Sequence, residues 1–586
     1  MFFQYSNFRR VGLALVTCFT LSVAMSVHAV EPIRVVGTNS RMSPFTYSPG
    51  STNTAFWQRS PHQLGGPVSE IDIAFMNWAV GYSGEVISSS DVTIEYAWLE
   101  RASDSQVVPL TFSGERELTM LGGVAQPYYM ADPIDSSVWT GGAPQRDEVF
   151  WLHVKGSVPT VDGKACLGVY TTYSGSKFIF YDPANDPGNV DEAMTVPNIT
   201  DKNQRTNGLA VMFGGRYTEP GYLSVIGLGD SILHGTGDAT NPTPVLAGNG
   251  YFNRAATNLE GTDTVGMLNL ARHGESANTF VNSHAMRGEF LEFANVVVEE
   301  YGTNDIGSGG TGNVDQLYTN VQAIWQLARD AGVEKVLRTN LLPRTGSESY
   351  NWVSKEDQTP NSGWGDGEKR DIFNGYLATA LSEGKIDVLV DTLTAVADPT
   401  DDHYWISTGA NDYATSDGTH LSRTGNELAA VPLRAAFEAI LNASETFSYT
   451  DWVDSIDWGG ADSSPTGDAN GDGVENLLAY GLDLSPLSNL AGQAAAFNFD
   501  LDTPDGPWVT LAYRVNQTAS DLQYAVLRSY DLTVGSWSVL SPDDSTVFEE
   551  VIDVDPDGDG SAELRQWRIK MPTDSPCFLK LEVTQS

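Results

Sequence analysis

The pattern of apolar residues changes near Gly221, and this change constrains the fold more than any other feature of the chain. Residues Tyr222–Leu228 form a nearly continuous apolar run, which is typical of a strand buried on both faces of a sheet. Similar runs follow at Ala294–Val298, Val333–Leu337 and Ile386–Val390. Between them, Val314–Gly332 places apolar residues at the helical period and ends on a glycine suited to a C-cap. Buried strands that alternate with helices predict a parallel α/β sheet.

The segments on either side of this α/β region have the pattern of short strands. Val92–Glu100 alternates apolar and polar residues, as a half-buried strand does. Further β-rich runs lie at Val149–Val154, Leu167–Tyr173, Lys177–Tyr181, Trp508–Val515 and Leu522–Arg528. Many short strands separated by Gly, Pro, Asp and Ser favour a β-sandwich.

These patterns predict a multidomain protein with five segments. We expect a signal peptide at 1–29, an all-β sandwich at 30–217, an α/β domain at 218–443, an acidic linker at 444–490 and a small β-domain at 491–586.

The charge and composition of the chain exclude several classes of function. The net charge is −42, from 33 basic and 75 acidic residues. Nucleic acid is therefore excluded as the main partner, because phosphate backbones bind basic patches. Docking on anionic membranes is disfavoured for the same reason. The hydrophobic share of 41% excludes a wholly disordered chain, and three cysteines are too few for a disulfide framework or a cysteine-based zinc site.

The first residues have the pattern of a secretory signal. Arg9 and Arg10 form a basic region, Val11–Val27 is largely apolar, and Ala29 ends a plausible cleavage site. The alternative is a membrane anchor, which the short apolar stretch with its Thr and Ser residues disfavours. No later stretch is apolar enough for a span. We expect an exported chain whose net charge, after loss of the two arginines, is −44.

A candidate nucleophile lies at the end of the first buried strand. Ser231, in Gly229-Asp230-Ser231, would lie at the carboxyl edge of the sheet, where ligand sites of α/β proteins gather. Serine needs a base at neutral pH, and His420 can take its proton. Asp417, three residues before that histidine, can orient and stabilise the imidazole. The other histidines lack a carboxylate at this spacing, and we expect His403 in a surface loop.

Donors for an oxyanion hole follow the neighbouring predicted strands. Asn304, in Gly302-Thr303-Asn304-Asp305, can donate through its side-chain amide. Gly274 can bring a backbone N–H close to a substrate, and the N–H of Ser231 would be a third donor. Each motif alone is an ordinary turn, but their order and their places at strand ends favour one site.

Together these motifs resemble the SGNH (GDSL-type) hydrolase family. Gly229-Asp230-Ser231 is similar to the first block of that family, Gly274 to the second, Gly302-x-Asn304-Asp305 to the third and Asp417-x-x-His420 to the fifth. The resemblance covers residues 218–441. It implies a flavodoxin-like three-layer fold and hydrolysis of acyl esters on carbohydrates or lipids, with no metal in the catalytic step. The absence of a Gly-x-Ser-x-Gly elbow argues against the α/β-hydrolase fold.

Two loops of this region carry open interpretations. The long segment Pro343–Gly367 contains Trp352 and Trp364, which either stack on a sugar ring or pack the loop. The glycine-rich Gly307–Gly312 lacks the ending of a phosphate loop, and we interpret it as a flexible rim of the site.

The acidic linker contains an EF-hand-like pattern. Asp468, Asn470, Asp472, the carbonyl of Val474 and Asn476 occupy positions 1, 3, 5, 7 and 9 of such a loop. This pattern resembles the single calcium loops of dockerin-like and thrombospondin-type segments. Ala479 stands at position 12, where a bidentate glutamate is expected, so we expect weak structural calcium binding or, alternatively, a solvated acidic turn. The run Asp553–Asp559 is more typical of a plain acidic turn.

The sequence therefore predicts a secreted, periplasmic or cell-surface serine esterase whose partner is an acylated carbohydrate, most plausibly an acetylated polysaccharide. A short-chain lipid or aryl ester is the alternative substrate. A surface carbohydrate-binding protein with a vestigial hydrolase domain is the alternative from another class.

Overall fold

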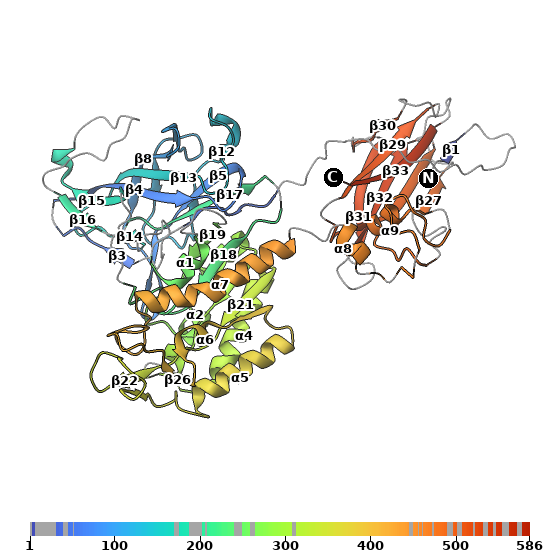
Figure 1. The fold of residues 1–586 in the computed structure, drawn as a ribbon. Helices are drawn as coiled ribbons and strands as arrows, with labels where there is room; N and C mark the ends of the chain where they lie inside the picture. The colour runs from blue at the N-terminus through green and yellow to red at the C-terminus, as the bar shows by residue number, and fades with distance from the viewer. Residues whose placement is uncertain are drawn as a thin grey trace. The chain divides into compact units, whose positions relative to one another are not determined.

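The structure of the protein is a computed structural model, shown in Figure 1. It describes residues 3–5, 31–38, 45–50, 52–168, 175–186, 202–205, 208–218, 220–238, 249–257, 264–307, 312–444, 449–454, 456, 458–459, 461–471, 474–488, 496–500, 507–519, 522–530, 537–542, 546–553, 562–570 and 577–585. The chain divides into two compact units, residues 30–439 and residues 1–29 together with 440–586.

The first unit begins with a β-sandwich. Its larger sheet has the order β10 (Leu118–Met120), β8 (Val92–Arg101), β13 (Val149–Ser157), β4 (Ala55–Gln63), β15 (Lys177–Tyr181) and β16 (Lys202–Arg205), with β9 (Val107–Pro109) on β8. The smaller sheet has the order β11 (Tyr129–Met130), β5 (Val68–Phe75), β17 (Val211–Tyr217) and β2 (Arg34–Val35), with β12 (Ile134–Asp135) on β5. Side chains of both sheets, such as Ile73 and Leu152, share one core. The predicted short strands are therefore strands of a sandwich.

One predicted strand of this region lies mostly outside the described residues. The run Leu167–Tyr173 was predicted to be a strand, and its first residue ends β14 (Ala165–Leu167), which pairs with β3 (Phe45–Tyr47). Residues 169–174 lie outside the described residues. Cys166 in β14 is buried and free, and burial raises the pKa of its thiol to about 12.

The four apolar runs predicted as buried strands form β18 (Ser224–Leu228), β20 (Val296–Glu299), β21 (Lys335–Thr339) and β24 (Val388–Val390) of the parallel sheet that follows, and β19 (Gly266–Asn269), which the sequence analysis missed, is its fifth strand. The order of the sheet is β19, β18, β20, β21 and β24, all parallel. Numbered along the chain, this is the doubly wound order 2-1-3-4-5. Every residue of β18 and β20 is buried, because helices cover both faces of the sheet.

Helices form the layers on the two faces. Val297 and Leu228 of the sheet share a core with α2 (Ala277–Asn282), α4 (Val314–Asp330) and α5 (Lys369–Ser382). The backbone of Gly227, whose Cβ would point to the other face, lies against Phe252 of α1 (Tyr251–Ala256). On α7 (Arg423–Ser444), the side chain of Arg434 donates to a carbonyl of α1.

The remaining short elements of the first unit are η1 (Ser136–Val138), η2 (Pro183–Asn185), η3 (Gly288–Phe293), α3 (Thr303–Ile306), α6 (Thr392–Val396), the pair β22 (Thr345–Ser347) with β23 (Gln358–Pro360), and the pair β25 (Ala397–Asp398) with β26 (Asp401–Trp405).

The local sequence explains the longest predicted helix. In α4, the side chain of Asn313 caps the N-terminus by accepting from Gln316 N–H at 3.1 Å. The helix ends at Asp330, and Gly332 adopts a positive φ of 88°, the conformation that a C-terminal glycine provides.

The sandwich and the parallel sheet are joined through a shared core. Val35, Trp78 and Met212 of the sandwich lie in the same apolar cluster as the helices α2 and α4. The Ser224 hydroxyl of β18 donates to the carbonyl of Val35 at 2.7 Å. At Gly266 the two sheets approach so closely that a Cβ would lie 2.0 Å from that carbonyl oxygen. In Figure 1 the blue strands of the sandwich accordingly lie against the green strands of the parallel sheet.

A hairpin of the sandwich reaches further onto the α/β part. It consists of β6 (Trp78–Gly81) and β7 (Gly84–Ile87), which pair with each other alone. The Trp78 indole packs against the ring of Phe290 in η3, with ring centroids 6.3 Å apart, and donates to the Pro127 carbonyl at 2.6 Å.

The second unit is a smaller sandwich with two four-stranded sheets. One has the order β27 (Ala496–Asp500), β28 (Trp508–Asn516), β32 (Ala562–Lys570), β31 (Val547–Asp553), and the other β1 (Phe3–Tyr5), β33 (Cys577–Gln585), β29 (Leu522–Ser529), β30 (Ser538–Val539). The runs Trp508–Val515 and Leu522–Arg528 are strands, as predicted. The strand β1 comes from the segment that the sequence predicts to be a signal peptide.

The segment 444–490, expected to be a polar linker, contains packed structure. Its helices α8 (Tyr449–Asp454) and α9 (Asn476–Gly481) form an aromatic cluster of Tyr449, Trp452 and Tyr480 that also holds Ala479. The sequence analysis did not predict this cluster, because the segment contains few aromatic residues and many acidic ones. No helix within the described ranges is long and apolar enough to cross a membrane.

Because one core serves both parts of the first unit, we predict that they unfold together. Replacing Trp78 by alanine should lower the free energy of unfolding by about 3–5 kcal/mol. Hydrogen exchange should then speed up to a similar extent in β13 of the sandwich and β20 of the parallel sheet. The control is Trp151→Ala, since Trp151 is only half-buried, beneath the Arg59 guanidinium. Faster exchange confined to the sandwich would contradict the shared core.

Candidate active site

The predicted nucleophile lies where the strand order of the parallel sheet reverses. Ser231 follows β18, and α3 with Asn304 follows the adjacent β20, so both lie at the carboxyl ends of the first and third strands. Ligand sites of doubly wound sheets form at this switch point, because the loops there leave in opposite directions.

The structure brings the predicted serine, histidine and aspartate together. His420 Nε2 lies 2.8 Å from Ser231 Oγ, and His420 Nδ1 lies 2.7 Å from Asp417 Oδ2. Ser231 is 3% exposed, and the imidazole of His420 is 17% exposed. The ring can therefore accept the serine proton through Nε2 while Nδ1–H donates to the carboxylate.

Asp417 is held in its ionised form. Burial alone would raise its pKa, but hydrogen bonds from the His420 ring and from the backbone N–H groups of His420 and Thr419 outweigh burial and lower the pKa to about 2. A carboxylate that stays charged at neutral pH can stabilise an imidazolium throughout the reaction.

The turn that carries Asp417 and His420 is fixed by the long loop before it. Gly418 has a φ of +74°, and a Cβ there would lie 1.8 Å from the carbonyl oxygen of Thr345. The carbonyl of Gly418 accepts from Thr345 N–H at 2.9 Å and from the Trp405 indole at 3.1 Å. Only glycine combines this backbone conformation with so close an approach.

The two tryptophans of this loop pack it rather than present a binding surface. Trp352 is 6% exposed and donates to the Thr345 hydroxyl at 3.0 Å. Trp364 is 1% exposed and donates to the Leu342 carbonyl at 3.2 Å. Of the two interpretations of these residues, packing is therefore correct.

Two of the three predicted oxyanion donors, Gly274 and Asn304, lie on segments that are hydrogen-bonded to each other. The Asn304 side-chain amide donates to the Glu275 carbonyl at 2.9 Å with one of its two hydrogens, which leaves the other for a ligand. Asp305 accepts from Ala277 N–H at 3.0 Å and so fastens the start of α2 to the same loop. Gly274 is exposed and has a φ of +76°. Within the described part of the chain, neither its N–H nor that of Ser231 donates a hydrogen bond.

A second histidine lies beside the candidate base. The ring of His273 stacks on that of His420, with centroids 5.9 Å apart and an interplanar angle of 20°. Burial, followed by the charges of His420 and Arg272, lowers the pKa of His273. The Thr236 hydroxyl lies 3.1 Å from His273 Nδ1 and 3.5 Å from Nδ1 of buried His234. Sequence reasoning missed these contacts of Thr236, because a threonine in a turn carries no signal of its own.

Two buried carboxyl groups bond the backbone of the turn that carries the nucleophile. Glu300 Oε2 accepts from the backbone N–H of Asp230 at 3.2 Å and from that of Leu233 at 3.3 Å. Asp230 Oδ1 accepts from Ile232 N–H at 2.9 Å. Burial raises the pKa of both groups, to about 6 for Asp230. The charge of Asp230 raises the pKa of Glu300 further, whereas a hydrogen bond with Glu300 lowers that of Asp230. The turn after β18 is thus built around a buried carboxyl pair whose pKa values are raised by burial.

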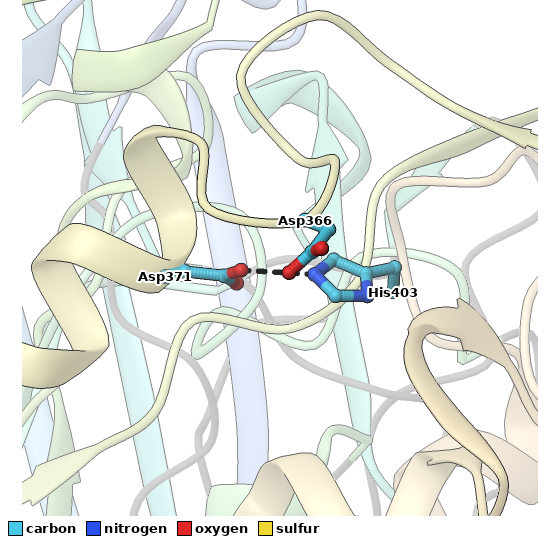
Figure 2. A group of neighbouring side chains, drawn as sticks. All are labelled: Asp366, Asp371 and His403. Atoms are coloured by element: carbon cyan, nitrogen blue, oxygen red, sulfur yellow. Dashed lines mark hydrogen bonds and ion pairs between the residues drawn. The ribbon is translucent and has the colours of Figure 1, made fainter.

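A separate acidic group surrounds His403. Figure 2 shows the carboxylates of Asp366 and Asp371 pointing toward its ring. His403 Nε2 lies 2.9 Å from Asp371, and Nδ1 lies 2.6 Å from Asp401. His403 was expected in a surface loop, but it belongs to β26 and its side chain is 13% exposed.

The contacts of His403 favour an ion cluster over a metal site. Burial alone would lower its pKa, but hydrogen bonds with Asp371 and Asp401 raise it. Each ring nitrogen faces a carboxylate oxygen at hydrogen-bond distance, and a protonated ring would keep no lone pair for a metal. Arg370, 1% exposed, adds a second positive charge at 2.8 Å from Asp371.

The predicted calcium loop is only partly within the described residues. Asp472 lies outside them, and so do Gly473, residues 308–311 of the glycine-rich rim and residues 554–559 of the second acidic run. Asp468 Oδ1 accepts from Gly471 N–H at 2.8 Å, and Asn470 donates to the Ser488 carbonyl. Asn476 donates to the carbonyl of Asp462 at 2.7 Å, whereas its Oδ1 is buried without a hydrogen-bond partner among the described residues. Ala479, at the position of the usual glutamate, is 1% exposed within the aromatic cluster.

Comparison with known proteins yields distant structural similarities only. No protein-family model and no curated protein matches the chain. A lipase/acylhydrolase from Enterococcus faecalis is 16% identical, covering 37% of this chain and 95% of its own, with a TM-score of 0.27. A carbohydrate acetylesterase family member from Sinorhizobium meliloti is 14% identical, over 37% and 99%, with a TM-score of 0.26. A family two carbohydrate esterase from Clostridium thermocellum, in complex with cellohexaose, is 12% identical, over 69% and 94%, with a TM-score of 0.27. The function is therefore inferred from the geometry of the site.

The buried pair Asp230–Glu300 predicts a loss of stability with rising pH. A carboxyl group whose pKa is raised on folding stabilises the fold below its ordinary pKa of about 4 and loses this contribution as the pH rises through the raised value. We expect the free energy of unfolding to fall as the pH rises from 5 to 8, and to fall further in the wild type than in Glu300→Gln, which removes one of the charges. Urea unfolding at both pH values measures this difference. The control is Glu289→Gln at an exposed carboxylate, and equal pH dependence in all three proteins would contradict it.

Proposed function

We propose that this chain is a secreted serine esterase that hydrolyses acyl esters, with acetyl esters of carbohydrates as its substrates. The observation that carries the proposal is the hydrogen-bonded series from Ser231 Oγ through the His420 ring to Asp417, at 2.8 and 2.7 Å. Its place at the switch point of the parallel sheet adds support. The carbohydrate part of the proposal rests on the resemblance of the sequence motifs to SGNH hydrolases.

The proposed reaction proceeds through an acyl-enzyme. Ser231 Oγ attacks the ester carbonyl while its proton passes to His420 Nε2, and Asp417 stabilises the imidazolium. The tetrahedral oxyanion accepts hydrogen bonds from Ser231 N–H, Gly274 N–H and the Asn304 amide. The C–O bond to the alcohol then breaks, and the alcohol leaves with the proton from His420. Water attacks the acyl-enzyme by the same route and releases the acid.

The competing interpretation is a carbohydrate-binding protein whose hydrolase domain is vestigial. Binding alone needs neither an aligned nucleophile and base nor a carboxylate held at a pKa of about 2. The geometry therefore favours the enzyme. Export of the chain, with cleavage after Ala29, remains part of the proposal, and the mass of the secreted protein would test it.

We predict that Ser231→Ala lowers kcat by at least about 10³-fold and that His420→Ala does the same, because the two residues act as one unit. Asp417→Ala should cost less, since the ring keeps its contact with the serine. Release of p-nitrophenol from p-nitrophenyl acetate measures the rates, and a panel of acetylated sugars and short-chain lipid esters separates the substrate classes. Ser416→Ala, an exposed serine in the same turn as His420, is the control. Near wild-type turnover of Ser231→Ala would overturn the site.

We also propose that Asp468, Asn470, Asp472, the Val474 carbonyl and Asn476 hold a structural calcium ion. All five offer oxygen ligands, the kind that calcium prefers. The buried, unpartnered Oδ1 of Asn476 fits this set. Burial, and then the charge of Asp468, raises the pKa of the neighbouring Glu475, as expected where acidic groups crowd together.

Calcium should then stabilise residues 440–586 without affecting ester hydrolysis. We predict that millimolar calcium raises the melting temperature of the second unit in the full chain relative to EDTA, because a ligand that binds only the folded state stabilises it. High concentrations are needed because Ala479 replaces a bidentate ligand. Asp468→Ala should abolish the shift. An unchanged calorimetric trace with calcium in excess would contradict the site, and loss of turnover in EDTA would contradict the metal-free mechanism.

A further inference from the structure

The hairpin β6–β7 of the N-terminal sandwich places an exposed aromatic ring beside the candidate oxyanion loop. Tyr82, at the tip of the hairpin, is 75% exposed. A Cβ built on Gly274 would lie 3.5 Å from Tyr82 Cε1, so the ring stands next to the backbone of that glycine. The guanidinium of Arg272 lies 5.0 Å from the ring centroid, and its Nε donates to the Val80 carbonyl at 2.9 Å. Residues 272–274 thus contact the hairpin on one side and His420, through His273, on the other.

Buried ion pairs fix the hairpin in this position. Glu85 Oε1 accepts from the Nε of Arg287 at 3.0 Å and from its backbone N–H at 3.0 Å. The other two nitrogens of this guanidinium donate to Glu275 at 2.7 and 2.8 Å. The side chains of Arg287, Glu85 and Glu275 are 0%, 7% and 1% exposed. Breaking such a group leaves an uncompensated buried charge, so the hairpin and the Gly274 loop are held as one piece.

The close contact at Gly84 adds a steric constraint. Gly84 has a φ of +111°, and a Cβ there would lie 2.3 Å from Ser283 Oγ. The same hydroxyl oxygen accepts from Glu85 N–H at 2.7 Å. The turn that carries Tyr82 therefore contacts the segment after α2 directly. Its position follows from the packing of the sandwich against the α/β part.

We propose that Tyr82 is a specificity-determining residue that binds the sugar ring bearing the ester, an assignment that rests on the proposed esterase function. Its aromatic ring is open to solvent, and the apolar face of a pyranose packs against such a ring. Its hydroxyl has no partner among the described residues, so it can bond a sugar hydroxyl. The tryptophans of the long loop are buried and cannot serve this purpose. The N-terminal sandwich is then part of the substrate site.

The test compares two esters that differ in their alcohol. Glucose pentaacetate offers a sugar ring, whereas ethyl acetate leaves only ethanol. We expect Tyr82→Ala to raise KM for the sugar ester and to lower the ratio of kcat/KM between sugar ester and ethyl acetate about tenfold, which corresponds to one lost stacking contact. Tyr82→Phe should retain most of the ratio. The matched control is Tyr96→Ala, since Tyr96 of β8 is also exposed and lies beneath an arginine, Arg116, but is not on the hairpin.

The outcomes separate this proposal from the esterase proposal. An unchanged ratio in Tyr82→Ala, with turnover of both esters intact, overturns the sugar subsite alone. An equal fall in kcat for both esters overturns it too, because Tyr82 would then only support the Gly274 loop. Melting curves of each variant show whether the fold is retained. A wild type that hydrolyses neither ester, nor p-nitrophenyl acetate, overturns the esterase function and the subsite with it.

Discussion

The buried guanidinium of Arg287 joins the parts from which the site is built. It binds Glu85 from the sandwich and Glu275 from the loop after β19, and all three side chains are almost fully removed from solvent. A charge in this environment requires both partners, because an unpaired buried ion is far more costly than an exposed one. The carbonyl of Glu275 in turn accepts from Asn304, so the position of the hairpin is coupled to that of the candidate oxyanion donors.

The carboxyl groups at the site have different pKa values, because their surroundings differ, and they therefore serve different roles. Asp417 receives several hydrogen bonds that lower its pKa to about 2, whereas Asp230 and Glu300 are fully buried and burial raises their pKa values. Asp417 can therefore stabilise a positive imidazole. Asp230 and Glu300 support the turn that carries Ser231. The difference arises from the number of donors and the access of water.

Much of the fold and of the candidate site could be predicted from the sequence, for identifiable reasons. The run Tyr222–Leu228 is apolar without alternation because β18 is covered on both faces, and this pattern is typical of buried parallel strands. Ser231, His420 and Asp417 could be paired because their motifs follow one another in order at strand ends. His403 was misplaced, because three consecutive polar residues look like a loop when their ionic partners on α5 are unknown.

The sequence by itself determined the periodicity of the strands and helices, the order of the motifs and the acidic character of the chain, since these depend on neighbouring residues alone. The tertiary structure decided the rest. The sandwich and the parallel sheet share a core, Tyr82 lies beside Gly274, and the tryptophans of the long loop turn inward. Tyr82 and Gly274 are far apart along the chain, and no local pattern encodes their contact. It follows from a complementary fit of two surfaces and from a buried charge that must be neutralised, both of which exist only after the chain has folded.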